Sequence, residues 1–276
     1  MARPSWPERP LVRGRVLRLD RPLVMAILNA TPDSFSDGGQ LPPPDSPEFA
    51  ALIRRMLADG ADLFDVGGES TRPGHAKVPA DEELRRVLPF IRAIRAVAPD
   101  AVISIDTRKA DVARAALAAG ADLVNDVGGL ADSSMAAVVR DAGCSIVLMR
   151  SEPCRGDVVE AAAEQLAGLV ERAKAAGLSE RQLILDPGLG FGDPPGGDPV
   201  ANMALLEGVP AYGPFPVLVG ASRKRFIGTL TGEGEPAKRV AGSVAAAVLA
   251  VKSGAAIVRV HDVAATVAGL RAVGLR

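Results

Sequence analysis

The run Leu23-Val24-Met25-Ala26-Ile27-Leu28 leads directly into the polar loop Asn29-Ala30-Thr31-Pro32-Asp33-Ser34-Phe35-Ser36-Asp37-Gly38-Gly39. Six consecutive apolar residues before a turn predict a strand that is buried on both faces. The loop carries an amide, two carboxylates and three hydroxyls, and its Gly-Gly pair lets the backbone swing. We interpret it as a loop that moves over a binding site, with an ordinary Asx-rich connection as the alternative.

This strand is the first of eight short apolar runs that alternate with eight Ala-rich segments of helical periodicity. The runs are Val24–Leu28, Leu63–Val66, Ala101–Ile105, Leu123–Val124, Ser145–Met149, Leu183–Leu185, Pro216–Val219 and Ala256–Val260. The helical segments are Pro47–Asp59, Asp81–Val97, Lys109–Ala119, Ser134–Asp141, Val158–Ala176, Pro199–Glu207, Pro236–Ser253 and Val263–Ala272. Strict alternation predicts an α/β fold, a single (β/α)8 TIM barrel, with a doubly wound parallel sheet as the runner-up.

The remaining segments fit one barrel. Leu11 to Asp20 alternates apolar residues with arginine, which predicts a strand or hairpin that closes the bottom of the barrel. Residues 1–10 are predicted to be a flexible N-terminal tail, so the barrel domain would span residues 11–276. Two long connections, Gln40–Ser46 and Gly192–Asp198, follow strands, on the face where barrels carry their active sites.

The composition narrows the class of protein. Hydrophobic residues make up 48% of the chain and aromatic residues only 3%, which suits small-residue helices packed on buried strands. A formal net charge of -1 gives no reason to expect nucleic acid or an anionic membrane as a partner. Since the first ten residues have no apolar core, we expect neither a signal peptide nor a membrane anchor, and a cytoplasmic location.

Cysteine and histidine are scarce. Cys144 and Cys154 are too few for a disulfide framework, and we expect a buried thiol and a loop thiol in a reducing compartment. His75 and His261 are too few for a histidine-rich zinc site, and no paired cysteine spacing supplies further ligands.

Polar residues gather where the predicted strands end. They include Asp65, Glu69, Asp106, Asn125, Met149-Arg150, Asp186, Phe191, Ser222-Arg223-Lys224-Arg225, Arg259 and His261. In a barrel these positions converge on one pocket. Carboxylates and amides above an apolar floor suit a flat heterocycle with N–H donors and carbonyl acceptors, whereas the cationic residues suit an anion.

Each of these residues also has a structural explanation. Asp65 and Glu69 could pair with an arginine and cap the next helix, which is commoner than a catalytic role. Asp106 directly follows an apolar strand, where ligand contact is at least as plausible as an internal ion pair. Arg259 and His261 are two residues apart and point the same way, as a phosphate site requires, although His261 alone could be a core histidine.

Seven motifs in one order make the chain resemble the dihydropteroate synthases of folate biosynthesis. They are the Asn29–Gly39 loop, Asp65–Gly74, Ser104–Thr107, Asn125–Val127, Asp186–Gly192, Gly220–Lys224 and Arg259–Asp262. The similarity runs from about Val24 to Asp262, and seven ordered motifs are far more specific than one glycine-rich loop.

The resemblance implies an enzyme that joins 6-hydroxymethyl-7,8-dihydropterin diphosphate to 4-aminobenzoate and releases pyrophosphate with the help of Mg2+. It also implies a (β/α)8 fold and a homodimer. We expect a dissociative mechanism, because the dihydropterin can spread positive charge while Mg2+, Arg259 and His261 stabilise the departing pyrophosphate. Asp37 would face the cationic methylene group.

The resemblance also assigns individual residues. Those implied to contact the pterin are Asp106, Asn125, Met149, Asp186, Phe191 and Lys224. Those implied to bind the diphosphate are Asn29, Arg72, Arg259 and His261, with Asn29 also meeting Mg2+. Those implied to close over the site are Phe35, Asp37, Thr71, Arg72 and Pro73. Ser222 and the Lys224-Arg225 backbone would lie beside the carboxylate of 4-aminobenzoate.

Two departures and three other functions accompany this resemblance. Arg150 follows Met149 where the family often has histidine, and Arg225 follows Lys224 where it often has serine.

A methyltetrahydrofolate-corrinoid methyltransferase would share the pterin contacts but not need the cations around Lys224 and Arg259. An inactive paralogue is a second alternative. A Schiff-base aldolase at Lys224 is a third, which borohydride trapping would reveal.

Overall fold

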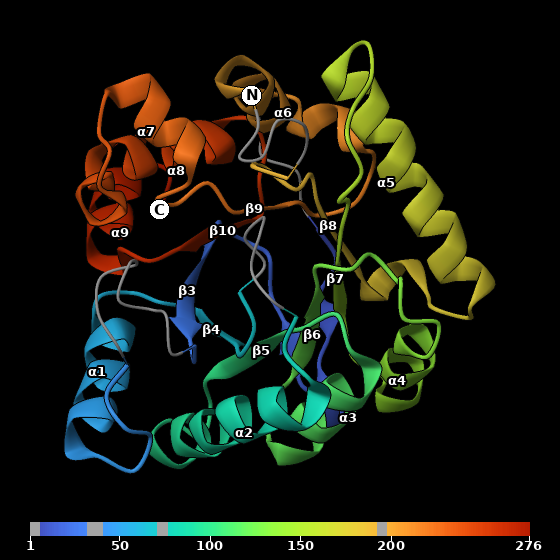
Figure 1. Cartoon of the computed structure of the whole chain (residues 1–276), viewed down its shortest axis with the longest axis vertical. Coiled ribbons are helices and arrows are strands. Elements are labelled where there is room, and N and C mark those ends of the chain that lie inside the picture. The colour runs from blue at the N-terminus through green and yellow to red at the C-terminus, as the bar shows by residue number, and fades with distance from the viewer. Residues whose placement is uncertain (1–5, 32–40, 71–76, 192–197) are drawn as a thin grey trace.

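Eight parallel strands form a barrel that is surrounded by helices (Figure 1). The computed structural model describes residues 6–31, 41–70, 77–191 and 198–276. The strands follow the order β8-β7-β6-β5-β4-β3-β10-β9, and a parallel bridge from Leu185 to Val217 brings the two edges of this sheet together. The predicted (β/α)8 barrel is therefore confirmed, and the doubly wound alternative is wrong.

All eight predicted strands and all eight predicted helices are present. The barrel strands are β3 (Leu23–Asn29), β4 (Leu63–Gly67), β5 (Val102–Asp106), β6 (Leu123–Asp126), β7 (Ile146–Met149), β8 (Leu183–Asp186), β9 (Leu218–Val219) and β10 (Ile257–Val260). The predicted helices are α1 (Pro47–Ala58), α2 (Ala80–Val97), α3 (Ala110–Ala119), α4 (Met135–Ala142), α5 (Val158–Ala175), α6 (Pro199–Glu207), α8 (Val240–Lys252) and α9 (Val263–Ala272). A further helix, α7 (Arg225–Thr231), lies where the sequence analysis predicted no helix.

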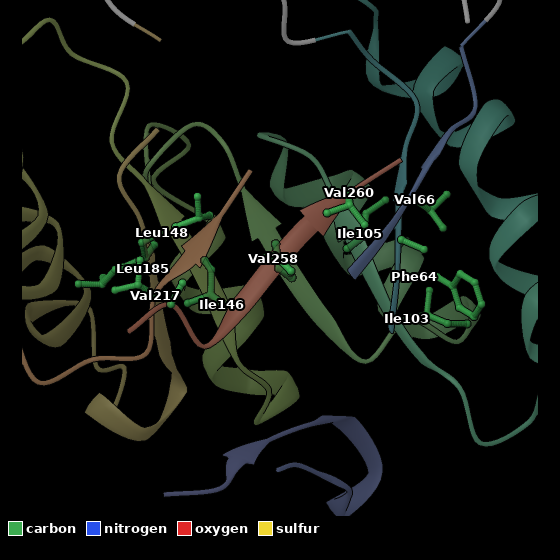
Figure 2. Packing of buried hydrophobic residues seen from close by; sticks show 14 of the residues in the cluster. Phe64, Val66, Ile103, Ile105, Ile146, Leu148, Leu185, Val217, Val258 and Val260 are labelled. Carbon is green, nitrogen blue, oxygen red and sulfur yellow. The ribbon is translucent and has the colours of Figure 1, made fainter. Parts of the chain in front are cut away.

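Alternate residues of each strand face opposite sides of the barrel wall. The outward set packs against the helices, and Figure 2 shows Phe64, Val66, Ile103, Ile105, Ile146, Leu148, Leu185, Val217, Val258 and Val260 from this set. The inward set fills the lower interior with Leu23, Met25, Leu63, Leu123, Val147, Ile184, Leu218 and Ile257. Inward positions one or two steps further along the strands therefore face the barrel mouth.

A short hairpin covers the opposite end of the barrel. Its strands β1 (Arg9–Pro10) and β2 (Val16–Leu17) pair antiparallel, and Figure 2 shows this segment below the strands. Leu11, Leu17 and Leu19 are buried with the lower interior residues. The predicted hairpin is confirmed, although it begins at Arg9, which lies within the segment expected to be a tail.

One buried carboxylate fastens this hairpin to the barrel. Asp122, at the start of β6, pairs with Arg13 at 2.9 Å, with Arg15 at 3.0 Å and with Arg95 of α2 at 2.7 Å. It also accepts a hydrogen bond from the backbone N–H of Ile103 at 2.9 Å. Three guanidinium groups and one amide thus satisfy a carboxylate that is fully buried.

Two further expectations concern the whole chain. Cys144 is buried, Cys154 is half-buried and both thiols are free, as predicted. None of the helices in the described ranges is long and apolar enough to cross a membrane.

Candidate functional site

The barrel mouth is built from polar residues at the inward positions of neighbouring strands. Asn29, Gly67, Asp106 and Asn125 are successive register partners across β3, β4, β5 and β6. Because Gly67 has no side chain, nothing from β4 fills the space between Asn29 and Asp106 at this level. The structure therefore brings Asp106 and Asn125 together at one edge of the mouth, as the sequence predicted.

Arg259 reaches from β10 to carboxylates on β4 and β5. Its Nε lies 2.6 Å from Asp65 Oδ2 and its Nη2 lies 2.7 Å from Asp106 Oδ2. Asn125 donates from Nδ2 to Asp65 Oδ2 at 3.0 Å. The expected pairing of Asp65 with an arginine is confirmed, but the partner comes from the last strand of the barrel.

Several oxygens in this cluster have no partner among the described residues. Asp65 Oδ1, Asp106 Oδ1 and Asn125 Oδ1 are buried and accept no hydrogen bond there. A buried polar atom without a partner is costly, so such atoms mark a place where a ligand supplies the donors. These three acceptors suit a molecule that carries N–H groups.

The electrostatics of the mouth agree with this interpretation. Burial raises the pKa of Asp106, and the nearby carboxylates of Asp65, Glu83 and Asp186 add to the rise against the opposing effect of Arg259. The pKa of Arg259 is raised in spite of burial, because Asp65 and Asp106 stabilise its charge. Arg259 is thus a fixed cation beside Asp106, a carboxyl group whose ionisation is opposed by burial.

Asp186 and Lys224 form the opposite side of the mouth. Gly188 donates its N–H to Asp186 Oδ1 at 2.7 Å, and a Cβ at Gly188 would lie only 2.3 Å from the carbonyl oxygen of Arg150. Lys224 donates from Nζ to the carbonyl of Leu189 at 2.5 Å. Burial lowers the pKa of Lys224 to about 8, although Asp186 opposes the shift.

An aromatic ring completes this side. The Nζ of Lys224 lies 5.0 Å from the centroid of the Phe191 ring, within the range of a cation–π interaction. Met149, whose exposed fraction is 2%, ends β7 on the inward side, directly paired in register with Asp186. Apolar and charged contacts for a flat ring therefore lie together, as predicted.

His261 lies beyond Arg259 on the same face of β10. Its ring Nδ1 is 3.0 Å from Ser222 Oγ, and its backbone N–H donates to the same oxygen at 3.2 Å. The adjacent residues also pair, since Arg223 lies 2.6 Å from Asp262. Arg259 pairs with Asp65 and Asp106, whereas His261 contacts Ser222. The two residues predicted to bind the diphosphate therefore have different partners in this structure.

A family model that describes pterin binding enzymes matches residues 25–261. The relatives include the dihydropteroate synthase of Escherichia coli, which is 40% identical over 95% of this chain and 94% of the relative. The chain belongs to the dihydropteroate synthase family of pterin binding enzymes.

Other matches give the same answer. A probable bifunctional folylpolyglutamate synthase/dihydropteroate synthase of Haloferax volcanii is 45% identical over 91% of this chain, and the chain spans only 30% of that relative. The dihydropteroate synthase of Xanthomonas albilineans, solved with 4-aminobenzoic acid, is 45% identical, with a TM-score of 0.84 and coverage of 96% and 97%. That of Burkholderia cenocepacia, complexed with 7,8-dihydropteroate, is 42% identical, with a TM-score of 0.85 and coverage of 99% and 96%.

The loop after β7 carries the main departure from the family motif. Arg150 is buried, and its Nη1 donates to the carbonyl of Glu152 at 2.5 Å and to Gln165 Oε1 at 3.2 Å. Its Nε is buried without a partner among the described residues. Arg150 therefore folds back onto its own loop and α5, while its backbone N–H donates to the carbonyl of Asp186 at 3.2 Å.

The expected pairing of Glu69 with an arginine is confirmed by Arg108, but the sequence analysis did not indicate Lys109 and Glu83, which extend this pair into a network. Glu69 pairs with Arg108 and Lys109, and Lys109 also pairs with the buried Glu83 of α2. Burial acts to raise the pKa of Glu69, but hydrogen bonds from Lys109 and Arg108 lower it. Glu83 shares a helix face with the buried Val87, so a carboxylate on an apolar face was the available sign.

The structure places the remaining predicted site residues as follows. Asn29 is half-buried at the end of β3, beside a cavity of about 350 Å3 between that strand and α2. Arg225 is exposed at the start of α7, which corrects its expected place on a strand tip. The predicted loop residues Phe35, Asp37, Thr71, Arg72 and Pro73 lie outside the described residues.

Proposed function

We propose that the chain condenses 6-hydroxymethyl-7,8-dihydropterin diphosphate with 4-aminobenzoate to give 7,8-dihydropteroate and pyrophosphate. The observation that carries this proposal is the set of buried acceptors at the barrel mouth, with Asp106 Oδ1 and Asn125 Oδ1 lacking partners among the described residues. The amino-pyrimidinone edge of a pterin supplies matching N–H donors. Family membership supports the same substrate.

Four polar residues would hold the pterin. The Asp186 carboxylate can accept two hydrogen bonds from the 2-amino-pyrimidinone edge, and Asp106 and Asn125 can accept others. Lys224 would donate to the ring carbonyl or to N5. Phe191 and Met149 would contact the faces or edges of the ring.

The diphosphate would lie between Asn29 and the cations of β10. Arg259 and His261 supply donors, and Arg72 of the second loop would add another. In the described ranges no group of three or more Cys, His, Asp or Glu could hold a metal, but Mg2+ often has only one or two protein ligands plus phosphate oxygens and water. The amide oxygen of Asn29 fits such a site, where Mg2+ would neutralise charge on the diphosphate.

We propose a dissociative order of events. The bond between the exocyclic CH2 group and the diphosphate oxygen breaks first, and the dihydropterin spreads the resulting positive charge. Arg259 and His261 stabilise the departing pyrophosphate, while Asp37 faces the cationic methylene group. The amine of 4-aminobenzoate then attacks, with its carboxylate beside the Lys224-Arg225 backbone, so no protein nucleophile is needed.

The two long loops would close over both substrates. Phe35 and Asp37 on the first loop, with Thr71, Arg72 and Pro73 on the second, would exclude water from the cationic intermediate. We further propose a cytoplasmic homodimer without nucleic acid or membrane partners.

The test is pyrophosphate release by the purified chain with Mg2+ and both substrates. Wild type should require both, and Asp186→Asn should lower kcat/KM for the pterin substrate about 10- to 100-fold, the value of a charged hydrogen bond. Asp111→Asn is a matched control, because Asp111 is an exposed carboxylate on α3 that pairs only with Arg114 among the described residues. Loss of activity in that control would mean that the assay reports folding.

Two results would contradict the proposal and favour another function. A chain that binds the pterin but releases no pyrophosphate would be an inactive paralogue or a methyltransferase-type enzyme. A carbonyl compound trapped on Lys224 by borohydride would favour Schiff-base chemistry, which a lysine with a pKa of about 8 can perform.

A further inference from the structure

Ser222 and His261 make two contacts with each other at the edge of the barrel mouth. The Ser222 hydroxyl oxygen lies 3.0 Å from His261 Nδ1 and 3.2 Å from the backbone nitrogen of His261. The exposed fraction of Ser222 is only 7%, so water does not readily replace either partner. These contacts join the turn after β9 to the end of β10.

The direction of these two hydrogen bonds follows from the protons that Ser222 and His261 carry. The backbone N–H of His261 can only donate, so Ser222 Oγ accepts that bond. The hydroxyl still has one proton, and the only other polar atom within reach in the described chain is His261 Nδ1. If Nδ1 carried a proton, the buried hydroxyl proton would have no acceptor.

We propose that Ser222 is a positioning residue that fixes His261 as the neutral tautomer with its proton on Nε2. Ser222 donates to Nδ1, so the ring proton of the neutral histidine lies on Nε2. An N–H donor is what an anionic oxygen requires, so this tautomer suits the diphosphate. That consequence rests on the proposed function, whereas the tautomer itself does not.

The surrounding contacts hold Ser222 in place. Arg223, the next residue, has a left-handed backbone with φ of 58°, which a non-glycine residue adopts only when its neighbours enforce it. Its N–H donates to Ser243 Oγ at 2.9 Å, its carbonyl accepts from Arg239 at 2.9 Å and its guanidinium pairs with Asp262. The turn is thus clamped on both sides of the Ser222–His261 contact.

This assignment gives Ser222 a different role from the 4-aminobenzoate contact implied by the resemblance. Its one proton is committed to His261, so the hydroxyl is not available to donate to the carboxylate of a second substrate. We therefore expect removal of the hydroxyl to affect the diphosphate end of the reaction rather than the arylamine end.

Nitrogen-15 NMR of histidine-labelled protein tests the tautomer directly, because the chain has only two histidines, His75 and His261. A His75→Gln variant leaves one set of ring signals. We expect Nε2 to carry the proton and Nδ1 to show the shift of a hydrogen-bonded acceptor. Ser222→Ala should move the Nδ1 signal to that of an unbonded acceptor, and Ser222→Thr should restore it.

Ser145→Ala is the matched control, because it removes a buried hydroxyl that donates to the carbonyl of Pro10 in the hairpin at the other end of the barrel. It should leave the His261 ring signals unchanged. A proton on Nδ1 in the wild type, or an unchanged Nδ1 signal in Ser222→Ala, would overturn the proposal.

Kinetics separate this proposal from the proposed function. In Ser222→Ala, KM for the pterin diphosphate should rise about 10-fold, the size of one hydrogen bond, while KM for 4-aminobenzoate stays constant. A changed Nδ1 signal with unchanged kinetics would support the tautomer and count against diphosphate binding by His261. The opposite change, in KM for 4-aminobenzoate alone, would overturn the reassignment of Ser222.

Discussion

At the scale of single residues, Lys224 should set the alkaline limit of activity. Burial lowers its pKa to about 8, and the ammonium form, which carries the positive charge, is the stronger hydrogen-bond donor to the pterin. We therefore expect kcat/KM for the pterin substrate to fall as pH rises through about 8. Lys224→Arg, which stays charged, should shift this fall in kcat/KM to higher pH. Lys252→Gln, on the exposed end of α8, should not shift it.

Unfolding would not produce the same profile. A lysine whose folded pKa lies below its unfolded value of 10.5 binds fewer protons in the folded state between those two values. Its contribution to the free energy of unfolding therefore rises with pH in that window. A fall in activity together with a fall in stability above pH 8 would contradict the assignment to Lys224.

The Arg259 cluster predicts a large effect on stability. Arg259 is the only cation within hydrogen-bonding distance of Asp65 among the described residues, and Asp65 is fully buried. Arg259→Met should lower the free energy of unfolding by about 3–5 kcal/mol, because a buried charge loses its partner. Adding Asp65→Asn should recover part of that loss, which urea unfolding of the single and double variants would measure. Additive losses in the double variant would show that the pair is not coupled.

The sequence predicts the members of this cluster better than their pairing. Asp106, Asn125, Asp186 and Arg259 could be placed at the mouth because each ends a strand on the inward side. Their partners could not be assigned, since Asp65 and Arg259 are 194 residues apart and meet only when β10 closes against β3. Strand periodicity gives direction along one element, whereas an ion pair depends on register across several.

At the scale of secondary-structure elements, the N-terminal hairpin should depend on Asp122. Asp122→Ala leaves Arg13, Arg15 and Arg95 without their shared carboxylate and removes the acceptor for Ile103 N–H. We expect a loss of about 3–5 kcal/mol in the free energy of unfolding.

The site lies at the other end of the barrel, so KM for both substrates should not change in folded Asp122→Ala. Asp141→Ala removes an exposed carboxylate that pairs with Arg140, and it should cost less than about 1 kcal/mol. Urea denaturation compares the two variants. Equal losses would mean that the hairpin is not fastened through Asp122.

Helices with strong periodicity were predictable, and α7, the one α-helix among the described residues that was not predicted, shows the limit. α7 has only seven residues and begins at Arg225, the last of three consecutive basic residues that we interpreted as part of an anion site. Its buried Phe226 and Ile227 are adjacent, too few to establish a period of 3.6. The long helices, by contrast, repeat an apolar face over several turns, and their ends were predicted to within four residues.

At the scale of the whole molecule, the barrel topology explains why one chain can place so many donors and acceptors in one pocket. Each parallel strand contributes its last inward residue to the same end. The lower interior is filled by leucine, isoleucine, valine and methionine, so a stable floor supports the polar mouth. The N-terminal hairpin closes the opposite end of the barrel. The loops at the carboxyl ends of the strands are therefore the segments that can contact a ligand.

The last prediction concerns assembly, since the proposed homodimer needs a face. On α8, Ala241, Ala245 and Leu249 are exposed at successive spacings of four residues, while Ala246 and Ala250 are buried on the other side. A helix that shows a stripe of alanine and leucine to solvent suits packing against a second copy. Light scattering at micromolar concentration should therefore give a mass of twice 28.4 kDa.

Leu249→Glu should yield the monomer, because the charge would be buried at the interface. Val16→Glu changes another exposed apolar residue, in the N-terminal hairpin, and should remain dimeric. A wild-type mass of 28.4 kDa would contradict the dimer, and dissociation by both variants would place the face elsewhere.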